Sequence, residues 1–182
     1  SSLLTIEDLL PLSPLQHGFL FHALYDQGVQ DSYVVQMVFA LDGALDAAAL
    51  RGAAQALLRR HASLRAAFVH HKIKEPVQVI QREVELPWRE IDIGVLPADE
   101  RADALAQAIA DDQQQRFELT RAPLLRFVLV RESATRHYLL FTSHHILLDG
   151  WSSPILLQEL FALYRNGADA QALPRVTPYR DY

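Results

Sequence analysis

The chain has 182 residues, half of them hydrophobic, which is enough for one domain with a real core and excludes a disordered chain. The net charge is -5, the pI is near 5.9 and no basic cluster is present, so nothing supports nucleic-acid binding. The absence of cysteine excludes disulfides, thiolate metal sites and a cysteine nucleophile. No signal peptide and no run of roughly 20 apolar residues is present, so we expect a soluble, cytoplasmic protein without membrane partners.

The first third of the chain predicts a helix, a strand and a second helix. Ser13-Pro14 is a good N-cap and first-turn pair, and it predicts a helix to about Tyr25 with Leu15 and Phe19 on one face. Residues 33–41 predict a strand, and Asp46 caps a second helix. The apolar stripe of that helix consists of Leu50, Ala53, Ala54, Leu57 and Leu58.

The second half alternates between extended and helical patterns. The expected elements, in chain order, are a hairpin over 64–69 and 76–80, an extended piece over 88–92, a helix over 97–117, strands over 124–130 and 136–143, and a helix over 154–164. Such alternation indicates an α/β or α+β sandwich, in which helices cover a sheet. After Gly167 the chain becomes polar and proline-bearing, as a linker does.

The most informative stretch is residues 143–152, Ser-His-His-Ile-Leu-Leu-Asp-Gly-Trp-Ser. The strand before it is apolar on both faces and therefore central in a sheet. Because side chains alternate across a strand, His144 and His145 are expected to point to opposite sides. An imidazole fixed at a strand end is well placed for acid–base chemistry.

A turn and a helix start follow the two histidines. Asp149-Gly150 is a turn signal, and Ser152 or Ser153 before Pro154 is an N-cap and first-turn signal. Adjacent histidines on a strand diverge and no helical H-E-x-x-H is present, so we expect no metal site. The serines near His145 lack a G-x-S-x-G elbow, and no glycine-rich phosphate loop exists.

The run resembles H-H-x-x-x-D-G, the signature of the condensation-domain superfamily of nonribosomal peptide synthetases, which is related to acyltransferases built like chloramphenicol acetyltransferase. Three further stretches resemble motifs of that family in the family's order. They are Leu-Ser-Pro-Leu-Gln-His-Gly-Phe-Leu-Phe-His at 12–22, Arg-His-Ala-Ser-Leu-Arg at 60–65 and Pro-Tyr-Arg-Asp-Tyr at 178–182. The resemblance therefore spans the whole chain.

The resemblance implies a fold of two similar lobes, each like half of a chloramphenicol acetyltransferase-type assembly, with the active site in a tunnel between them. This chain matches the N-terminal lobe only, a mixed β-sheet covered by helices. Residues 1–167 are identified as this lobe, and residues 168–182 as the start of the linker towards the missing C-terminal lobe.

The resemblance also assigns roles to residues of the motifs. His145 takes the family's catalytic position, and His144 is a support residue that points away from the tunnel. Asp149 would pair with Arg65 rather than orient His145 as in a catalytic triad, and Gly150 would allow a backbone conformation denied to other residues. Possible site-lining residues are Gln16, His17, Trp151 and Ser152. His17 stands where the family often carries glutamate, which changes the charge of a helix thought to border the site.

The function that the resemblance implies is amide-bond formation between two carrier-bound groups, as in antibiotic or siderophore biosynthesis. The donor acyl or peptidyl thioester and the acceptor aminoacyl thioester are held on phosphopantetheine of upstream and downstream peptidyl carrier proteins, and the lobe itself needs no cofactor. The first motif and the Trp151-Ser152 continuation resemble the subtype that accepts a D-configured donor. The alternatives are an epimerization domain of the same superfamily and a non-catalytic carrier-docking lobe. Alone, the lobe is expected to be inactive and to self-associate through its exposed inter-lobe face.

Overall fold

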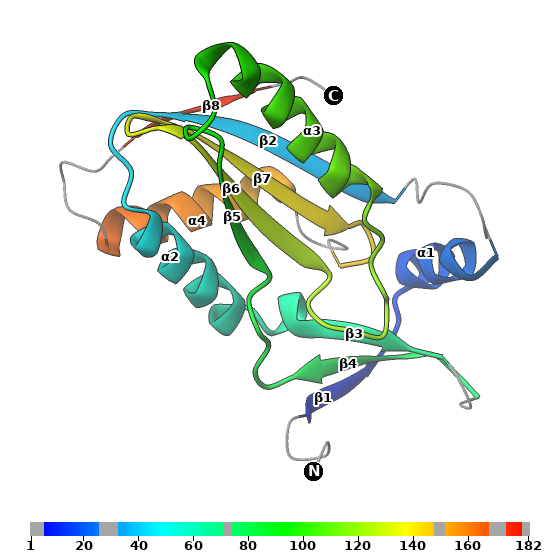
Figure 1. Ribbon diagram of the computed structural model, residues 1–182. Helices are drawn as coiled ribbons and strands as arrows, with labels where there is room; N and C mark the ends of the chain where they lie inside the picture. Colours follow the sequence, from blue (N-terminus) through cyan, green and yellow to red (C-terminus); the bar gives the residue numbers. More distant parts are fainter. Residues whose placement is uncertain (1–5, 26–32, 71–73, 148–151, 168–173, 180–182) are drawn as a thin grey trace.

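The computed structural model describes residues 6–25, 33–70, 74–147, 152–167 and 174–179 (Figure 1). The helices of this part are α1 (Pro14–Tyr25), α2 (Ala47–Arg60), α3 (Arg101–Gln114) and α4 (Ser153–Gly167), with short 3-10 turns at Ala62–Arg65 and Ala98–Glu100. The strands are β1 (Ile6–Pro11), β2 (Val34–Asp42), β3 (Ala66–Val69), β4 (Val77–Gln81), β5 (Trp88–Asp92), β6 (Leu125–Ser133), β7 (Arg136–His144) and β8 (Arg175–Pro178).

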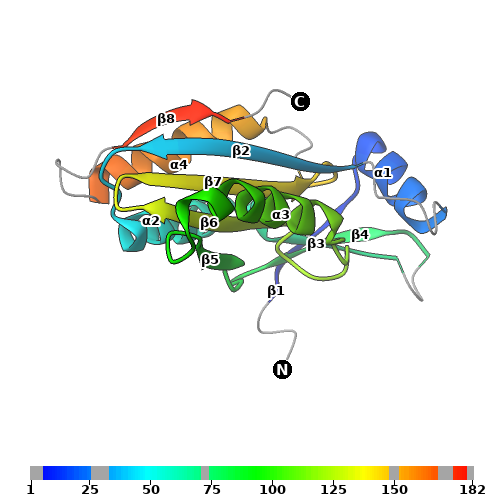
Figure 2. The same ribbon diagram turned by 45° about the horizontal axis from the view of Figure 1, so that its top comes forward.

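A five-stranded sheet in the order β5-β6-β7-β2-β8 forms the centre of the molecule. Strand β5 runs parallel to β6, and the other neighbours are antiparallel, so the sheet is mixed as predicted. Helix α3 covers one face of this sheet, and α2 and α4 cover the other (Figures 1 and 2). A second, antiparallel sheet of order β1-β4-β3 lies beside it. The prediction of a helix-covered α/β sandwich is confirmed.

Each face of the main sheet has its own hydrophobic core. On the α2 and α4 face, the predicted stripe of α2 is buried throughout and packs with Leu156 and Leu160 of α4 and with Phe141 of β7. On the opposite face, Ile109 of α3 packs against Leu140 of β7. Alternate residues of β7 therefore enter two different cores, which explains why the sequence of this strand is apolar on both faces.

The expected helix caps are present. Asp46 accepts a hydrogen bond at Oδ1 from the Ala49 N–H (3.0 Å) and donates its own N–H to the hydroxyl oxygen of Tyr164 in α4 (3.1 Å). Ser152 accepts at Oγ from the Ile155 N–H (3.3 Å) at the start of α4. The two helices behind β7 are thus fixed at their beginnings as well as by their apolar faces.

Several elements differ from the sequence prediction. Helix α3 ends at Gln114, three residues earlier than expected, and residues 62–65 form a 3-10 turn rather than the start of a strand. Strand β1 was not expected, and β8 occupies part of the segment assigned to a linker. Both are edge strands held by hydrogen bonds to β4 and β2, so partners far away in the chain, rather than a local pattern, define them.

Candidate active site

The two motif histidines lie at the carboxyl end of β7, in the middle of the main sheet. Strand β7 ends at His144, opposite Val34 of β2. The His144 N–H donates to the carbonyl oxygen of Leu124, just before β6, and the His145 N–H donates to that of Tyr33, just before β2. These bonds, of 3.0 and 2.8 Å, tie successive peptides to the two neighbours of the strand. The backbone that carries both imidazoles is therefore fixed on both sides.

His144 is completely buried. Its Nδ1 accepts a hydrogen bond from the Ile146 N–H (3.0 Å), so in the neutral ring the proton is carried on Nε2. The imidazole also lies nearly perpendicular to the Phe117 ring, with centroids 6.5 Å apart and an interplanar angle of 80°. These contacts place the His144 imidazole inside the core.

His145 is exposed in the turn that follows β7. Its ring lies nearly parallel to that of Phe19 in α1, with centroids 5.7 Å apart and an interplanar angle of 15°. Phe19 in turn meets Tyr33 edge to face at 4.9 Å. The prediction that neighbouring histidines occupy opposite environments is confirmed, whereas the contact with Phe19 was not anticipated.

The first motif forms the start of α1. Ser13 and Gln16 make a reciprocal capping box, because the Gln16 N–H donates to Ser13 Oγ (3.1 Å) and the Ser13 N–H donates to Gln16 Oε1 (2.9 Å). Gln78 of β4 also donates to Gln16 Oε1 (3.1 Å), so this buried amide attaches α1 to the second sheet. His17 is exposed on α1. Among the described residues, no hydrogen bond or ring contact joins Gln16 or His17 to His145.

Arg65, which ends the second motif, is buried and makes four hydrogen bonds to other described residues. Its Nε donates to the Leu58 carbonyl oxygen (2.9 Å), and its Nη1 lies near Glu7 Oε2 (2.8 Å) and the carbonyl oxygens of Gln81 (2.5 Å) and Arg82 (3.1 Å). The guanidinium thus joins the end of α2 to both β1 and β4. The predicted partner, Asp149, lies outside the described residues, as do Gly150 and Trp151.

The first residues of the second motif connect α2 to α4. Glu159 of α4 lies 2.7 Å from His61 Nε2 and 3.3 Å from Arg60 Nε. Helix α4 begins directly after the histidine motif. These contacts of Glu159 therefore restrain the helix that follows the motif in the chain.

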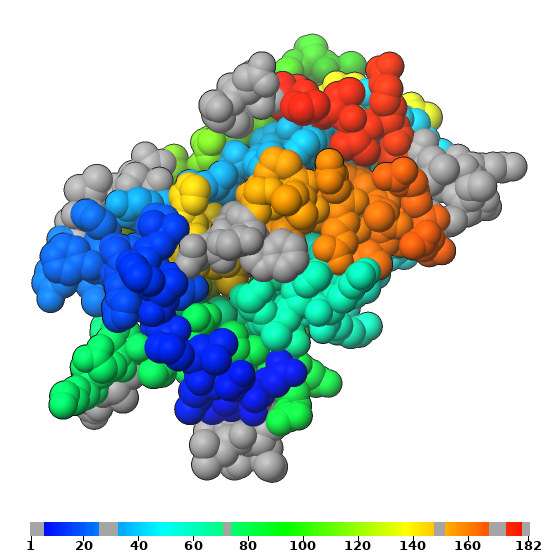
Figure 3. Space-filling model, turned by 180° about the vertical axis from the view of Figure 1, so that it is seen from behind, coloured from blue at the N-terminus to red at the C-terminus, as the bar shows by residue number. Residues whose placement is uncertain are grey.

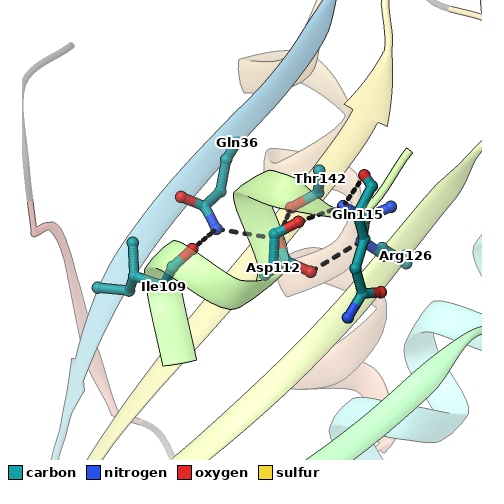
Figure 4. Close-up of polar contacts among 6 residues, drawn as sticks. All are labelled: Gln36, Ile109, Asp112, Gln115, Arg126 and Thr142. Atoms are coloured by element: carbon teal, nitrogen blue, oxygen red, sulfur yellow. Dashed lines mark hydrogen bonds and ion pairs between the residues drawn. The ribbon is translucent and has the colours of Figure 1, made fainter. Parts of the chain in front are cut away.

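A buried polar network, not predicted from the sequence, joins α3 to the main sheet (Figure 4). Asp112 of α3 receives hydrogen bonds from Gln36 of β2 (2.9 Å) and Thr142 of β7 (2.5 Å), and it pairs with Arg126 Nε of β6 (2.8 Å). One signal was available, because Gln36 and Thr142 are polar residues within apolar strands and stand opposite each other in the sheet.

The network leads to the buried histidine through one aromatic ring. The Arg126 guanidinium lies over the Phe117 ring at 4.4 Å, and the same ring meets His144. Phe117 and Arg126 also line a cavity of about 670 Å³ between segment 85–88 and segment 116–126. One wall of this cavity is therefore the ring that contacts His144.

The described residues hold no group of three or more histidine, cysteine, aspartate or glutamate side chains arranged for a metal ion. Within the same ranges, no helix has the length and apolar composition that crossing a bilayer demands.

The architecture is an α/β sandwich that presents one histidine at the end of its central strand and buries the preceding one. The family model for the condensation domain matches residues 6–182, and the chain belongs to this family, whose function is peptide-bond formation in nonribosomal peptide synthetases.

Two proteins similar in sequence to this chain are peptide synthetases much longer than it. A linear gramicidin synthase protein of Brevibacillus parabrevis is 40% identical over 179 residues, which is 97% of this chain and 3% of that protein. Gramicidin S synthase 2 of Brevibacillus brevis is 34% identical over 179 residues, 97% of this chain and 4% of that protein. The chain thus spans a small part of these relatives.

Solved condensation domains share the fold. The starter condensation domain of rhizomide synthetase RzmA matches with a TM-score of 0.76 and 22% identity, over 93% of this chain and 40% of that chain. The first condensation domain of the CDA synthetase matches with a TM-score of 0.76 and 21% identity, over 93% of this chain and 42% of that chain. This chain corresponds to less than half of either structure.

Proposed function

We propose that this chain supplies the catalytic histidine, His145, for amide-bond formation between two carrier-bound substrates. In this reaction the amine of the acceptor aminoacyl group attacks the thioester carbonyl carbon of the donor. A C–N bond forms, the C–S bond breaks, the donor's phosphopantetheine thiol leaves, and the amine gives up a proton. Imidazole is the side chain suited to accept or hydrogen-bond that proton near neutral pH.

The observation that carries the proposal is the exposed imidazole of His145 on a backbone fixed by the central sheet. Among the described residues, no hydrogen bond or ion pair engages its ring nitrogens. Within the described part of the chain, the nitrogens are therefore available to a substrate amine. Thioester aminolysis has a good leaving group, so holding the amine next to the carbonyl supplies much of the rate.

The other motif residues support this histidine in the proposal. His144 and Arg65 fix the end of β7 and the adjoining second sheet, and Asp149 pairs with Arg65 instead of His145. Within the described residues the contacts of Arg65 use Nε and Nη1, so Nη2 is available for that carboxylate. Gly150 allows the motif turn. Gln16, His17, Trp151 and Ser152 are proposed to line the substrate path.

A second lobe completes the site in the proposal. Helix α1 and strand β1 expose five large hydrophobic side chains, called here the α1–β1 patch: Leu9, Leu10, Leu15, Phe21 and Tyr25. In Figure 3, α1 lies at the left, in blue, and β1 lies below it towards the lower middle, in darker blue. An apolar helix with exposed aromatic residues is typical of an element covered in a larger assembly. The covering surface is the C-terminal lobe. The two carrier proteins insert their phosphopantetheine groups into the tunnel between the lobes.

The test uses the complete condensation domain containing this chain, with donor and acceptor carrier proteins loaded in advance. His145→Ala should reduce the rate of amide formation by several orders of magnitude, whereas His70→Ala, which removes a histidine outside the motifs, should keep the parental rate. The stereochemistry of the donor α-carbon is followed in the same samples. A folded His145→Ala domain with the parental rate would disprove the catalytic role, and inversion of the α-carbon without amide formation would identify an epimerization domain instead.

A further inference from the structure

Within the described structure, the ring of Phe19 stacks on the imidazole of His145. In Ser-His-Asp sites, a hydrogen-bonded carboxylate fixes the plane of the imidazole. Here no described residue hydrogen-bonds the His145 ring, and the nearly parallel Phe19 ring, at 15° and 5.7 Å, takes that place. The Tyr33 carbonyl oxygen holds only the main chain of His145.

A stacked ring restrains an imidazole without blocking its chemistry. The χ2 torsion of histidine is broad, so an exposed imidazole without a neighbour rotates over many orientations. A parallel aromatic face limits this rotation, because tilting the imidazole gives up the stacking contact. Both nitrogens of an imidazole form their hydrogen bonds in the plane of the ring. They therefore stay available to a substrate while the Phe19 ring covers one face.

Phe19 is itself held firmly. Its ring meets Tyr33 edge to face, and the next residue of α1, Leu20, is almost completely buried in the core. The capping box formed by Ser13 and Gln16 fixes the start of the same helix. The position of the Phe19 ring is thus determined by elements on both sides of it.

We propose that Phe19 is a positioning residue for condensation, which holds the imidazole of His145 in the plane required for contact with the acceptor amine. The first motif is thereby connected to the histidine motif by a ring-to-ring contact. This inference rests on the proposed function of His145. Misplacement of a reacting group by about 1 Å is enough to lower a rate by up to about a hundredfold.

The experiment measures both the orientation of the ring and the rate in the complete condensation domain. Histidine labelled with ¹³C at Cε1 gives one resonance for each imidazole, and His145→Gln identifies the signal of His145. Phe19→Leu should move this signal, because the ring current of Phe19 is lost. The control is Phe161→Leu, in α4, whose ring makes no contact with His145 within the described structure; it should leave the signal in place.

The kinetic arm compares variants of Phe19 under single turnover with loaded carriers. Phe19→Leu should lower the maximal rate about tenfold or more while the concentration of carrier at half-saturation stays unchanged. Phe19→Tyr keeps the ring and should restore the rate, and a merely structural role would not produce this pattern. Phe19→Met serves as a second ring-less variant, since methionine favours a helix and keeps apolar volume.

The results separate two failures. Ring-less variants that fold and keep the parental rate, an unmoved His145 signal, or a Phe19→Tyr domain as slow as Phe19→Leu would each overturn the positioning role. Parental activity in His145→Ala would instead overturn the proposed function, and the role of Phe19 with it, even where Phe19→Leu still moves the signal of His145.

Discussion

His144 and His145 are consecutive residues whose imidazoles occupy opposite environments, one completely buried and the other exposed. The backbone N–H of the first donates to the β6 side of the sheet and that of the second to the β2 side. The same pair of residues therefore places one imidazole inside the core and the next one at the surface. Substitutions at the two positions should consequently have different effects.

His144→Ala should lower the free energy of unfolding by about 2–4 kcal/mol, because it leaves a cavity and an unsatisfied Ile146 N–H in the core. His145→Ala should cost about 1 kcal/mol or less, since the ring is exposed and loses one stacking contact. Urea unfolding of the two variants measures the difference. Equal losses would contradict the division of roles between the two histidines.

Arg65→Ala should lower the free energy of unfolding by roughly 3–5 kcal/mol, because it leaves Glu7 and three carbonyl oxygens without their cation. Arg65→Lys should recover little, since one ammonium cannot reach the same divergent acceptors. If Asp149 pairs with Arg65, the loss in the Arg65→Ala, Asp149→Ala double variant should be much smaller than the sum of the single losses. If the losses of unfolding free energy were additive, Asp149 would not pair with Arg65. A role for Asp149 in orienting His145 would then have to be considered again.

Asp112→Ala should destabilise the domain by about 3–5 kcal/mol, because Arg126 would remain as a partly buried cation without its carboxylate, and Gln36 and Thr142 would lose their acceptor. Its neighbour Asp111 is exposed and bonds only to Gln107 among the described residues, so Asp111→Ala is a matched control with an expected change within about 0.5 kcal/mol. Thermal or urea unfolding of both variants tests this. A stable Asp112→Ala protein would mean that the network contributes little to the fold.

The stability of the domain should fall as the pH decreases below about 6.5, in part through His137. Burial lowers the pKa of His137 below its ordinary value, and the charge of Arg131 acts in the same direction, against the weaker opposite effects of Asp92 and Glu90. Below about pH 6.5, His137 is therefore protonated more readily in the unfolded chain than in the folded one. Its contribution to the free energy of unfolding is complete above about pH 6.5 and is lost as the pH falls below that value. Denaturant unfolding at pH 7.5, 6.5 and 5.5 should show a smaller decrease for His137→Gln than for the parent. An identical decrease would show that this group is not responsible.

The chain of 182 residues on its own should self-associate and should not catalyse condensation. The α1–β1 patch exposes Phe21 and Tyr25 by 58% and 71%, and their replacement by serine should shift the chain towards monomer in sizing experiments. Turnover by the chain alone, measured with loaded carriers, would show that one lobe suffices. A chain that remains monomeric at every concentration would show that the patch does not drive association.

Much of the main sheet and its helices could be predicted from sequence, because local patterns determine them. The stripe of α2, its Asp46 cap and the doubly apolar β7 depend on residues close together in the chain. The two edge strands, the Asp112 network and the Phe19 contact depend on partners far away in sequence, such as Asp112 with Gln36 and Phe19 with His145. The position of His145 at a strand end was accessible from the motif, whereas the ring that orients it was not.

The pairing of β2 with β7 has a consequence for the synthesis of the protein. The paired residues, from Val34 opposite His144 to Asp42 opposite Arg136, are about a hundred residues apart in the chain. At a translation rate of roughly 5–20 residues per second, β7 leaves the ribosome several seconds or more after β2. During this interval the apolar strand and the stripe of α2 have no sheet to cover them, so the nascent chain is exposed to aggregation until the histidine motif itself has been translated.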